Sequence, residues 1–173
     1  MDDLKQYIRD IPDFPKEGIM FHDITPLLQD GNAFSMAIDA MAEDIKDRDV
    51  NCLVGVEARG FIFAAALAYK LGIGLGIVRK LGKLPYETIN ISYSLEYGND
   101  ALEMHKDTLI NGRRIVMVDD LLATGGTAAA TADLVKKINA EIVGYSFLIE
   151  LMELRGRDKL APSPVWSILK YPV

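Results

Sequence analysis

The chain has 173 residues, of which 50% are hydrophobic and 25% are charged, proportions that suit one globular domain with a sizeable core. The formal net charge of −6 argues against general binding to nucleic acid or to an anionic membrane surface. The only cysteine, Cys52, lies in an apolar run and excludes an internal disulfide. No apolar run is long enough to span a bilayer and the N-terminus is acidic, so we expect a cytoplasmic protein without membrane or nucleic-acid partners.

The first third of the chain mixes helical patterns with an apolar segment that has no clean period. Residues 2–9 predict a short amphipathic helix, which the prolines at 12 and 15 prevent from continuing. Residues 18–28 are apolar and read as a loop that covers the core or as a lid that exposes Phe21; composition favours the loop. Asp23 is expected to cap or brace this segment. Residues 32–47 predict a helix with Asn32 as a possible cap.

Two strand-to-loop units follow. Residues 52–56 predict a buried strand, and the polar residues Glu57, Ala58 and Arg59 stand between it and a helix over 61–71. Ligands of open α/β sheets bind at the carboxyl ends of the strands, where these residues are expected to lie. A local ion pair between Glu57 and Arg59 is the plainer interpretation. The next strand, 75–78, leads into a basic loop with three cations, Arg79, Lys80 and Lys83. Such a run of cations is usually only solvated, but in an acidic protein it also indicates a binding site for an anionic ligand.

Residues 86–108 predict two antiparallel strands joined by a loop, an excursion long enough to suggest a lid. Toward the C-terminus, strands are expected over 114–118, 141–149 and 165–169, with a helix over 127–138. The charged segment 150–160, in which Arg155 and Arg157 flank a glycine, is open to an anion site, but its resemblance to a surface connector of a known protein family favours a structural role. These elements together predict an α/β fold in one domain, 1–173.

The strand at 114–118 is followed by an acidic pair and then by a loop of small residues. Backbone N–H groups at the start of the next helix favour a phosphate, and Gly125 and Gly126 allow it to approach closely. Thr124 and Thr127 add hydroxyl groups, and either could cap the helix. Asp119 and Asp120 accept hydrogen bonds only, so they suit a sugar diol or a divalent cation held through water. An ordinary turn with solvated acids is the alternative, but two adjacent carboxylates repel unless something bridges them. The stretch therefore predicts a ribose 5-phosphate site.

This stretch resembles the PRPP (5-phosphoribosyl 1-pyrophosphate) motif of the type I phosphoribosyltransferases, and four further strings resemble the family in the same order. They are the hood segment from Phe21 to Leu28, similar to that of adenine phosphoribosyltransferases, the Arg-Gly-Phe loop, the Arg-Lys-Leu-Gly-Lys-Leu-Pro loop and Tyr-Ser-Leu-Glu-Tyr-Gly. The resemblance implies a central, mostly parallel sheet flanked by helices, an N-terminal hood within 1–31 and a flexible β-hairpin lid within 86–108. This sequence departs from the family pattern at Glu57, where many members have aspartate, and at Met20, where members have a smaller apolar residue.

The resemblance also implies roles for individual residues. The adenine-binding set is Ile19, Met20, Phe21 and Arg59. The pyrophosphate-binding set is Glu57, Ala58, Arg59, Arg79, Lys80 and Lys83. The PRPP-binding set is Asp119, Asp120, Ala123, Thr124, Gly125, Gly126 and Thr127. Catalysis is assigned to Glu96 and Arg59, with Tyr97 in the lid.

The implied reaction joins adenine and PRPP to give AMP and pyrophosphate, with Mg²⁺ bound through PRPP and water rather than by protein ligands, in a homodimer. A transferase for hypoxanthine, guanine or xanthine is one alternative. A non-catalytic PRPP or purine sensor is another, against which the acidic balance and the lack of an appended DNA-binding segment count.

Overall fold

The computed structural model describes residues 2–95, 98–108 and 113–172. Its centre is a seven-stranded sheet in the order β5-β6-β4-β3-β7-β8-β9. The five strands β3 (Cys52–Val56), β4 (Gly74–Lys80), β7 (Arg114–Leu122), β8 (Glu141–Leu151) and β9 (Val165–Tyr171) pair in parallel. The hairpin β5 (Thr88–Leu95) and β6 (Gly98–His105) is antiparallel and joins the edge at β4. The expected α/β fold with a mostly parallel sheet is confirmed.

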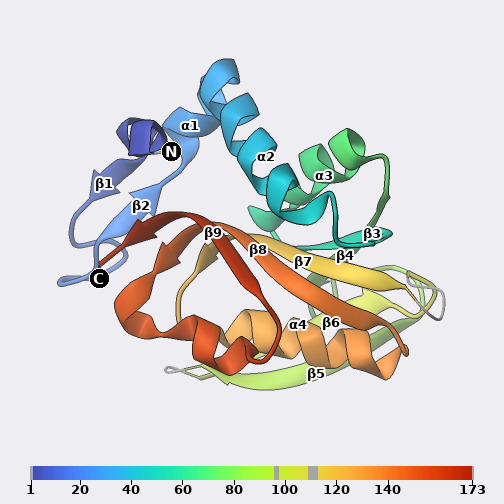
Figure 1. Ribbon diagram of the computed structural model, residues 1–173. Helices are drawn as coiled ribbons and strands as arrows, with labels where there is room; N and C mark the ends of the chain where they lie inside the picture. The colour runs from blue at the N-terminus through green and yellow to red at the C-terminus, as the bar shows by residue number, and fades with distance from the viewer. Residues whose placement is uncertain (1, 96–97, 109–112, 173) are drawn as a thin grey trace.

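Helices cover both faces of this sheet, as parallel strands require. Helices α2 (Gly31–Ile45) and α3 (Gly60–Leu71) lie on one face, and α4 (Gly126–Lys137) lies on the other (Figure 1). Each face has its own apolar core: Phe63, Leu67 and Val116 belong to the first, and Met117, Leu134 and Phe147 to the second. Among the described residues, no helix is long and apolar enough to cross a membrane.

The N-terminal region is more ordered than the sequence indicated. A 3₁₀ helix, η1 (Asp2–Tyr7), replaces the expected amphipathic helix. The segment without a clean period contains a strand and a helix: β2 (Phe21–Asp23) pairs with β1 (Arg9–Ile11), and α1 (Thr25–Gln29) follows. Asp23 braces this turn as expected, because its Oδ1 accepts hydrogen bonds from the backbone N–H and the hydroxyl of Thr25 at 2.9 and 2.6 Å.

Several element ends differ from the expectation. Strand β4 continues to Lys80, so Arg79 and Lys80, which were expected in a loop, belong to the end of the strand. The cap of α2 is Asp30, not Asn32, because the Asp30 carboxylate accepts the N–H groups of Asn32 and Ala33. Strand β7 continues to Leu122, so the acidic pair lies inside the strand rather than after it. The expected connector 150–160 holds the end of β8 and two 3₁₀ helices, η2 (Met152–Leu154) and η3 (Gly156–Leu160).

The register of the sheet brings the site residues to one edge. Val56 of β3 pairs with Val78 of β4, and Gly55 of β3 pairs with Val118 of β7. The residues that come next in each strand, Glu57, Arg79 and Asp119, therefore emerge close together at the carboxyl edge.

Candidate active site

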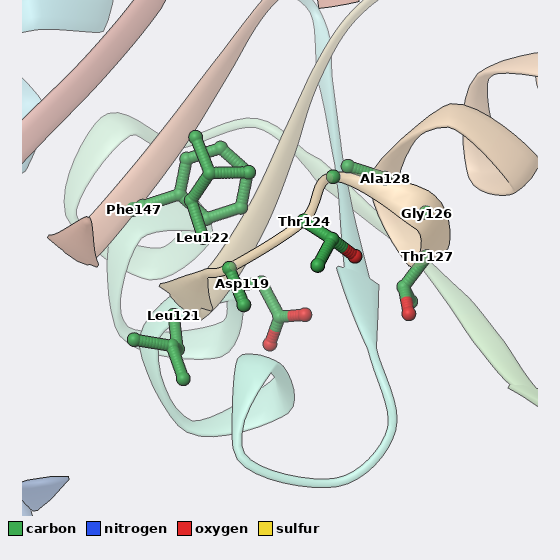
Figure 2. Close-up of a pocket in the computed structure, with 10 residues that line it drawn as sticks. Asp119, Leu121, Leu122, Thr124, Gly126, Thr127, Ala128 and Phe147 are labelled. Carbon is green, nitrogen blue, oxygen red and sulfur yellow. The ribbon is translucent and has the colours of Figure 1, made fainter. Parts of the chain in front are cut away.

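The phosphate loop, residues 123–127, comprises the connection from β7 to α4 and the first two residues of α4. It lines a pocket of about 90 Å³. Figure 2 shows the Asp119 carboxylate and the hydroxyl groups of Thr124 and Thr127 on the same side of this loop. Leu122 and Phe147 form the apolar wall. Because the threonine hydroxyls and the start of α4 line the same small pocket, it has hydrogen-bond donors suited to a phosphate.

Glycine rather than threonine begins α4. Gly125 is the N-cap residue with φ 78° in the left-handed region, and no side chain caps the helix. The expectation that Thr124 or Thr127 caps α4 is therefore wrong. The uncapped N–H groups at this helix start remain available to a ligand, as an anion site at a helix N-terminus requires.

The two acids of the motif take different directions. Asp119 lines the phosphate pocket and accepts the N–H of Asp120 at 2.9 Å. Asp120 is only 6% exposed, and its Oδ2 lies 2.8 Å from Nε of Arg59. Burial and the neighbouring Asp120 carboxylate raise the pKa of Asp119 well above its ordinary value. Burial also raises the pKa of Asp120, although the Arg59 guanidinium opposes this shift. Arg59 is thus the ion-pair partner of Asp120, and its positive charge also opposes the rise in the pKa of Asp119.

A residue without a predicted role makes room for Asp119. A Cβ added to Gly60, the first residue of α3, would lie 2.7 Å from Oδ1 of Asp119 and 3.0 Å from the carbonyl oxygen of Val118. Glycine is therefore required here by close approach. The sequence contains Gly60 in its Arg-Gly-Phe string, but only the fold shows that this glycine faces β7.

Arg59 also connects the acidic pair to the N-terminal region. Its guanidinium carbon lies 5.3 Å from the centre of the Phe21 ring, within the range of a cation–π interaction. Phe14 meets Phe21 edge to face, with ring centroids 5.1 Å apart. Ile19 and Met20 are 38% and 45% exposed. Three of the predicted groups, the PRPP acids, the pyrophosphate arginine and the base-stacking phenylalanine, therefore form a connected chain of contacts.

Glu57, Ala58 and Arg59, the first three residues of the pyrophosphate set, lie between β3 and α3. The peptide bond between Glu57 and Ala58 is cis, and Ala58 is exposed between the two charged residues. Glu57 does not pair with Arg59. Instead, Nε and Nη2 of Arg79 donate to its two carboxylate oxygens at 3.1 and 2.9 Å. Hydrogen bonds from Arg79 hold the pKa of Glu57 below its ordinary value.

The basic loop, residues 79–85, is held by carboxylates at both ends. Nη1 of Arg79 donates to the carbonyl oxygen of Lys83 at 3.0 Å, which closes the loop on itself. Glu103 of β6 is 3% exposed and accepts the backbone N–H groups of Lys83 and Leu84 at 2.8 and 2.9 Å. Glu103 therefore has a structural role in this loop. Nζ of Lys80 lies 3.3 Å from Oδ2 of Asp100, and the Lys83 side chain is exposed.

The β5–β6 hairpin reaches the phosphate loop as well as the basic loop. The hydroxyl of Tyr93 in β5 lies 3.3 Å from the hydroxyl of Thr127. Tyr93 was not singled out, since a tyrosine in an alternating strand carries no local sign of such a contact. The predicted catalytic Glu96 and lid residue Tyr97 lie outside the described residues.

A direct metal site is not among these features. In the ranges that the structure describes, no group of three or more histidine, cysteine, aspartate or glutamate side chains is arranged to hold a metal ion. The carboxylates of Asp119 and Asp120 do suit a divalent cation that is bound through water and through the oxygens of a substrate.

These features define an α/β protein with a site for a phosphorylated sugar at the carboxyl edge of its sheet. Comparison with known proteins narrows this class. The family described as "Phosphoribosyl transferase domain" matches residues 27–169. The adenine phosphoribosyltransferase of Syntrophotalea carbinolica is 56% identical over 99% of this chain and 100% of its own length. That of Clostridium botulinum strain Hall is 52% identical over 98% of this chain and 99% of its own.

Solved structures agree with the sequence relatives. The crystal structure of adenine phosphoribosyltransferase from Thermoanaerobacter pseudethanolicus has a TM-score of 0.96 and 49% identity, covering 98% of this chain and 99% of that one. The enzyme from Saccharomyces cerevisiae, crystallised with adenine and an imino-altritol bisphosphate, has a TM-score of 0.91 and 40% identity, with 97% of both chains covered. The chain therefore belongs to the phosphoribosyltransferase family and, within it, to the adenine phosphoribosyltransferases.

Proposed function

We propose that the protein transfers the 5-phosphoribosyl group of PRPP to N9 of adenine, forming AMP and pyrophosphate in purine salvage. The observation that carries the proposal is the position of Arg59, which joins Asp120 of the acidic pair to Phe21 of the N-terminal region. This contact connects the groups suited to a ribose diol with an aromatic ring suited to a purine. The relatives and structural neighbours described above support the same activity.

In this proposal the substrate lies along the carboxyl edge of the sheet. The N–H groups of the phosphate loop and the hydroxyls of Thr124 and Thr127 hold the 5-phosphate. Asp119 and Asp120 accept hydrogen bonds from the ribose hydroxyls. Phe21 stacks on adenine, and the backbone at Ile19 and Met20 reads the edge of the base. This hood and the β5–β6 hairpin would close over the site and exclude water, which would otherwise hydrolyse PRPP.

The chemical step transfers charge to the departing pyrophosphate. Adenine N9 forms the new bond to C1 of the ribose, and the bond from C1 to the pyrophosphate oxygen breaks with its electron pair. Arg59 and the basic loop, with Arg79, Lys80 and Lys83, stabilise that negative charge. Glu96 would assist the proton movement on the adenine ring during attack. Mg²⁺, bound through pyrophosphate oxygens and water near Asp119 and Asp120, would neutralise part of the developing charge.

Two further proposals concern the state of the enzyme. We expect a cytoplasmic homodimer. Large exposed apolar side chains support an interface with a second subunit: Tyr69 is 91% exposed, Tyr86 is 62% exposed and Leu81 is 56% exposed. Leu81 lies within the basic loop and Tyr86 directly follows it, so a partner subunit there would lie close to the pyrophosphate groups. Analytical ultracentrifugation tests this expectation, and a monomer at micromolar concentration would contradict it.

The activity is tested by following pyrophosphate release from PRPP and Mg²⁺ with adenine, hypoxanthine, guanine or xanthine. We expect turnover with adenine that exceeds turnover with each other purine by at least about 100-fold, because backbone groups that hydrogen-bond the adenine edge would be left unpaired by a purine with a different edge. Preference for another purine would reassign the substrate. Binding of PRPP without release of pyrophosphate with any purine would identify a sensor instead of an enzyme.

A further inference from the structure

The phosphate loop contacts a segment that has no part in the proposed chemistry. Gly156, the first residue of η3, lies directly behind the loop, and the two backbones touch. A Cβ added to Gly156 would overlap the carbonyl oxygen of Ala123 and would lie 2.9 Å from the backbone nitrogen of Gly125. A Cβ added to Gly125 would overlap the carbonyl oxygen of Gly156 in turn.

The two glycines are required for different reasons. Gly125 adopts φ 78°, which side chains disfavour whatever the space around them. Gly156 is not among the described glycines with positive φ, so its backbone conformation is open to other residues. The close approach to residues 123–125 alone requires glycine at 156. A methyl group there must displace the phosphate loop or the start of η3.

A buried ion pair holds Gly156 in this position. The next residue, Arg157, donates from Nε to Oε1 of Glu150 at 2.6 Å, and its Nη2 donates to Oε2. The hydroxyl of Ser167 in β9 also donates to Oε2 of Glu150. The Glu150 side chain is 2% exposed, whereas that of Arg157 is 37% exposed. One carboxylate therefore joins β8, β9 and η3.

Glu150 also lies beside the start of the phosphate loop. Glu150 in β8 is the sheet partner of Leu122, the last residue of β7 before the loop. The loop is thus held on one side by the sheet and on the other by η3, with Glu150 attached to both. Burial alone raises the pKa of Glu150, but hydrogen bonds from Arg157 and Ser167 outweigh it and hold the pKa below its ordinary value, so this carboxylate is ionised at neutral pH.

We propose that Gly156, fixed by the Glu150–Arg157 pair, is a positioning residue that sets the backbone N–H groups of the phosphate loop for the 5-phosphate of the substrate. The inference rests on the proposed function and adds to it a part of the chain with no direct contact to the reacting atoms. An anion cradle made of backbone groups works only if those groups are held before the ligand arrives.

The test compares Gly156→Ala with Gly74→Ala as a matched control. Gly74 lies at the amino end of β4, where an added Cβ meets nothing closer than Cys52 Sγ at 3.5 Å. For Gly156→Ala we expect KM for PRPP and the dissociation constant of ribose 5-phosphate to rise by about 10- to 100-fold, the range that a small misplacement of binding groups produces. KM for adenine and the dissociation constant of magnesium pyrophosphate should stay within about threefold of wild type. The control should match wild type in all four quantities.

Glu150→Gln is the second variant, and it decides the matter if Gly156→Ala does not fold. It keeps the size of the side chain but removes the charge that fixes Arg157, so the same selective rise is expected at about 3- to 10-fold. Values of KM for PRPP within twofold of wild type in every variant that folds would overturn the proposal. An equal rise for adenine and PRPP would also overturn it, because it would indicate general damage. Failure of the wild-type protein to bind ribose 5-phosphate or PRPP would instead contradict the proposed function.

Discussion

The phosphate loop (residues 123–127) and the basic loop (residues 79–85) both lie at the carboxyl ends of parallel strands, and both are assigned to anionic groups of one substrate. They are held in different ways. The phosphate loop is enclosed between the sheet and η3 by backbone contacts, with Gly125 buried. The basic loop is exposed for most of its length and depends on carboxylates: Glu57 holds Arg79, and Glu103 holds the backbone at Lys83 and Leu84.

This difference matches what each loop has to do in the proposed reaction. The 5-phosphate stays in place throughout the transfer, so a rigid cradle costs nothing during the chemical step. The pyrophosphate gains charge and then leaves, so its contacts have to strengthen and release. Side-chain pairs between arginine and carboxylate can exchange partners in a way that backbone groups cannot.

The largest effect is expected from the acidic pair beside the phosphate loop. Asp119→Ala combined with Asp120→Ala should weaken PRPP binding by about 10³-fold, because charged acceptors of hydrogen bonds contribute about 1.5–3 kcal/mol each. Burial raises the pKa of both groups, so their charges do not stabilise the fold and the free energy of unfolding should not fall. Titration calorimetry with PRPP measures the loss. Asp39→Ala, which removes an exposed pair with Lys70, is the control, and unchanged affinity in the double variant would refute the role.

Glu96→Gln tests a residue that is assigned to the chemical step rather than to holding the substrate in place. General acid–base assistance contributes about 10²- to 10⁴-fold, so kcat should fall by that factor. The dissociation constant of PRPP should change little, because Glu96 is assigned to the base. Single-turnover kinetics with adenine separates the two quantities. Turnover close to wild type would remove Glu96 from the mechanism.

Glu57→Gln should affect the pyrophosphate side alone. Without the second charged acceptor, Arg79 loses its bidentate pair, and kcat/KM should fall by about 10-fold as the basic loop loses its fixed geometry. The affinity for ribose 5-phosphate should stay at the wild-type value, since the phosphate loop does not touch Glu57. Glu87→Gln, at an exposed pair with Lys106, serves as the matched variant. If ribose 5-phosphate affinity fell as well, the two loops would not be independent.

The smallest expected effect is on stability at low pH. Burial raises the pKa of Glu103, but the N–H groups of Leu84 and Lys83 outweigh it and hold the pKa below its ordinary value of 4.5. A carboxylate with a depressed pKa in the folded state contributes stability above pH 4.5, and this contribution is lost as the pH falls through the folded pKa. At pH 7 the free energy of unfolding of Glu103→Gln should therefore be about 1 kcal/mol lower than that of wild type. This difference should shrink below pH 4.5.

Chemical denaturation from pH 7 to pH 3 measures this difference. Glu43→Gln, at an exposed pair with Lys46, should show almost no effect at any pH, because exposed ion pairs contribute little. A gap between wild type and Glu103→Gln that stayed constant with pH would show that the Glu103 carboxylate does not titrate with folding.

The sequence predicted the parallel strands and the edge at which ligands bind, because runs such as 52–56 and 114–118 are apolar on both faces and are followed by polar residues. It did not predict how the charged residues pair. Glu57 meets Arg79 and not Arg59, since the partner is decided by strands that lie next to each other in the sheet rather than by distance along the chain. Element ends were also missed where a single side chain decides them, as Asp30 does for α2.

The contact of Gly156 with the phosphate loop shows the same limit most clearly. A glycine between two arginines in a charged segment has no local pattern that indicates a close backbone approach. Only the position of η3 against the phosphate loop shows that a side chain at this residue has no room. Residues that act through contact with another loop are therefore the part of a site that periodicity and motif spacing do not reveal.

The central claim is that the phosphate loop is the anchor of the substrate, and binding of AMP and adenosine to the wild-type protein tests it most directly. The two ligands differ only in the 5-phosphate. The account predicts that AMP binds at least about 100-fold more tightly than adenosine, as two or more charge-assisted hydrogen bonds would give. Equal dissociation constants for the two would contradict it.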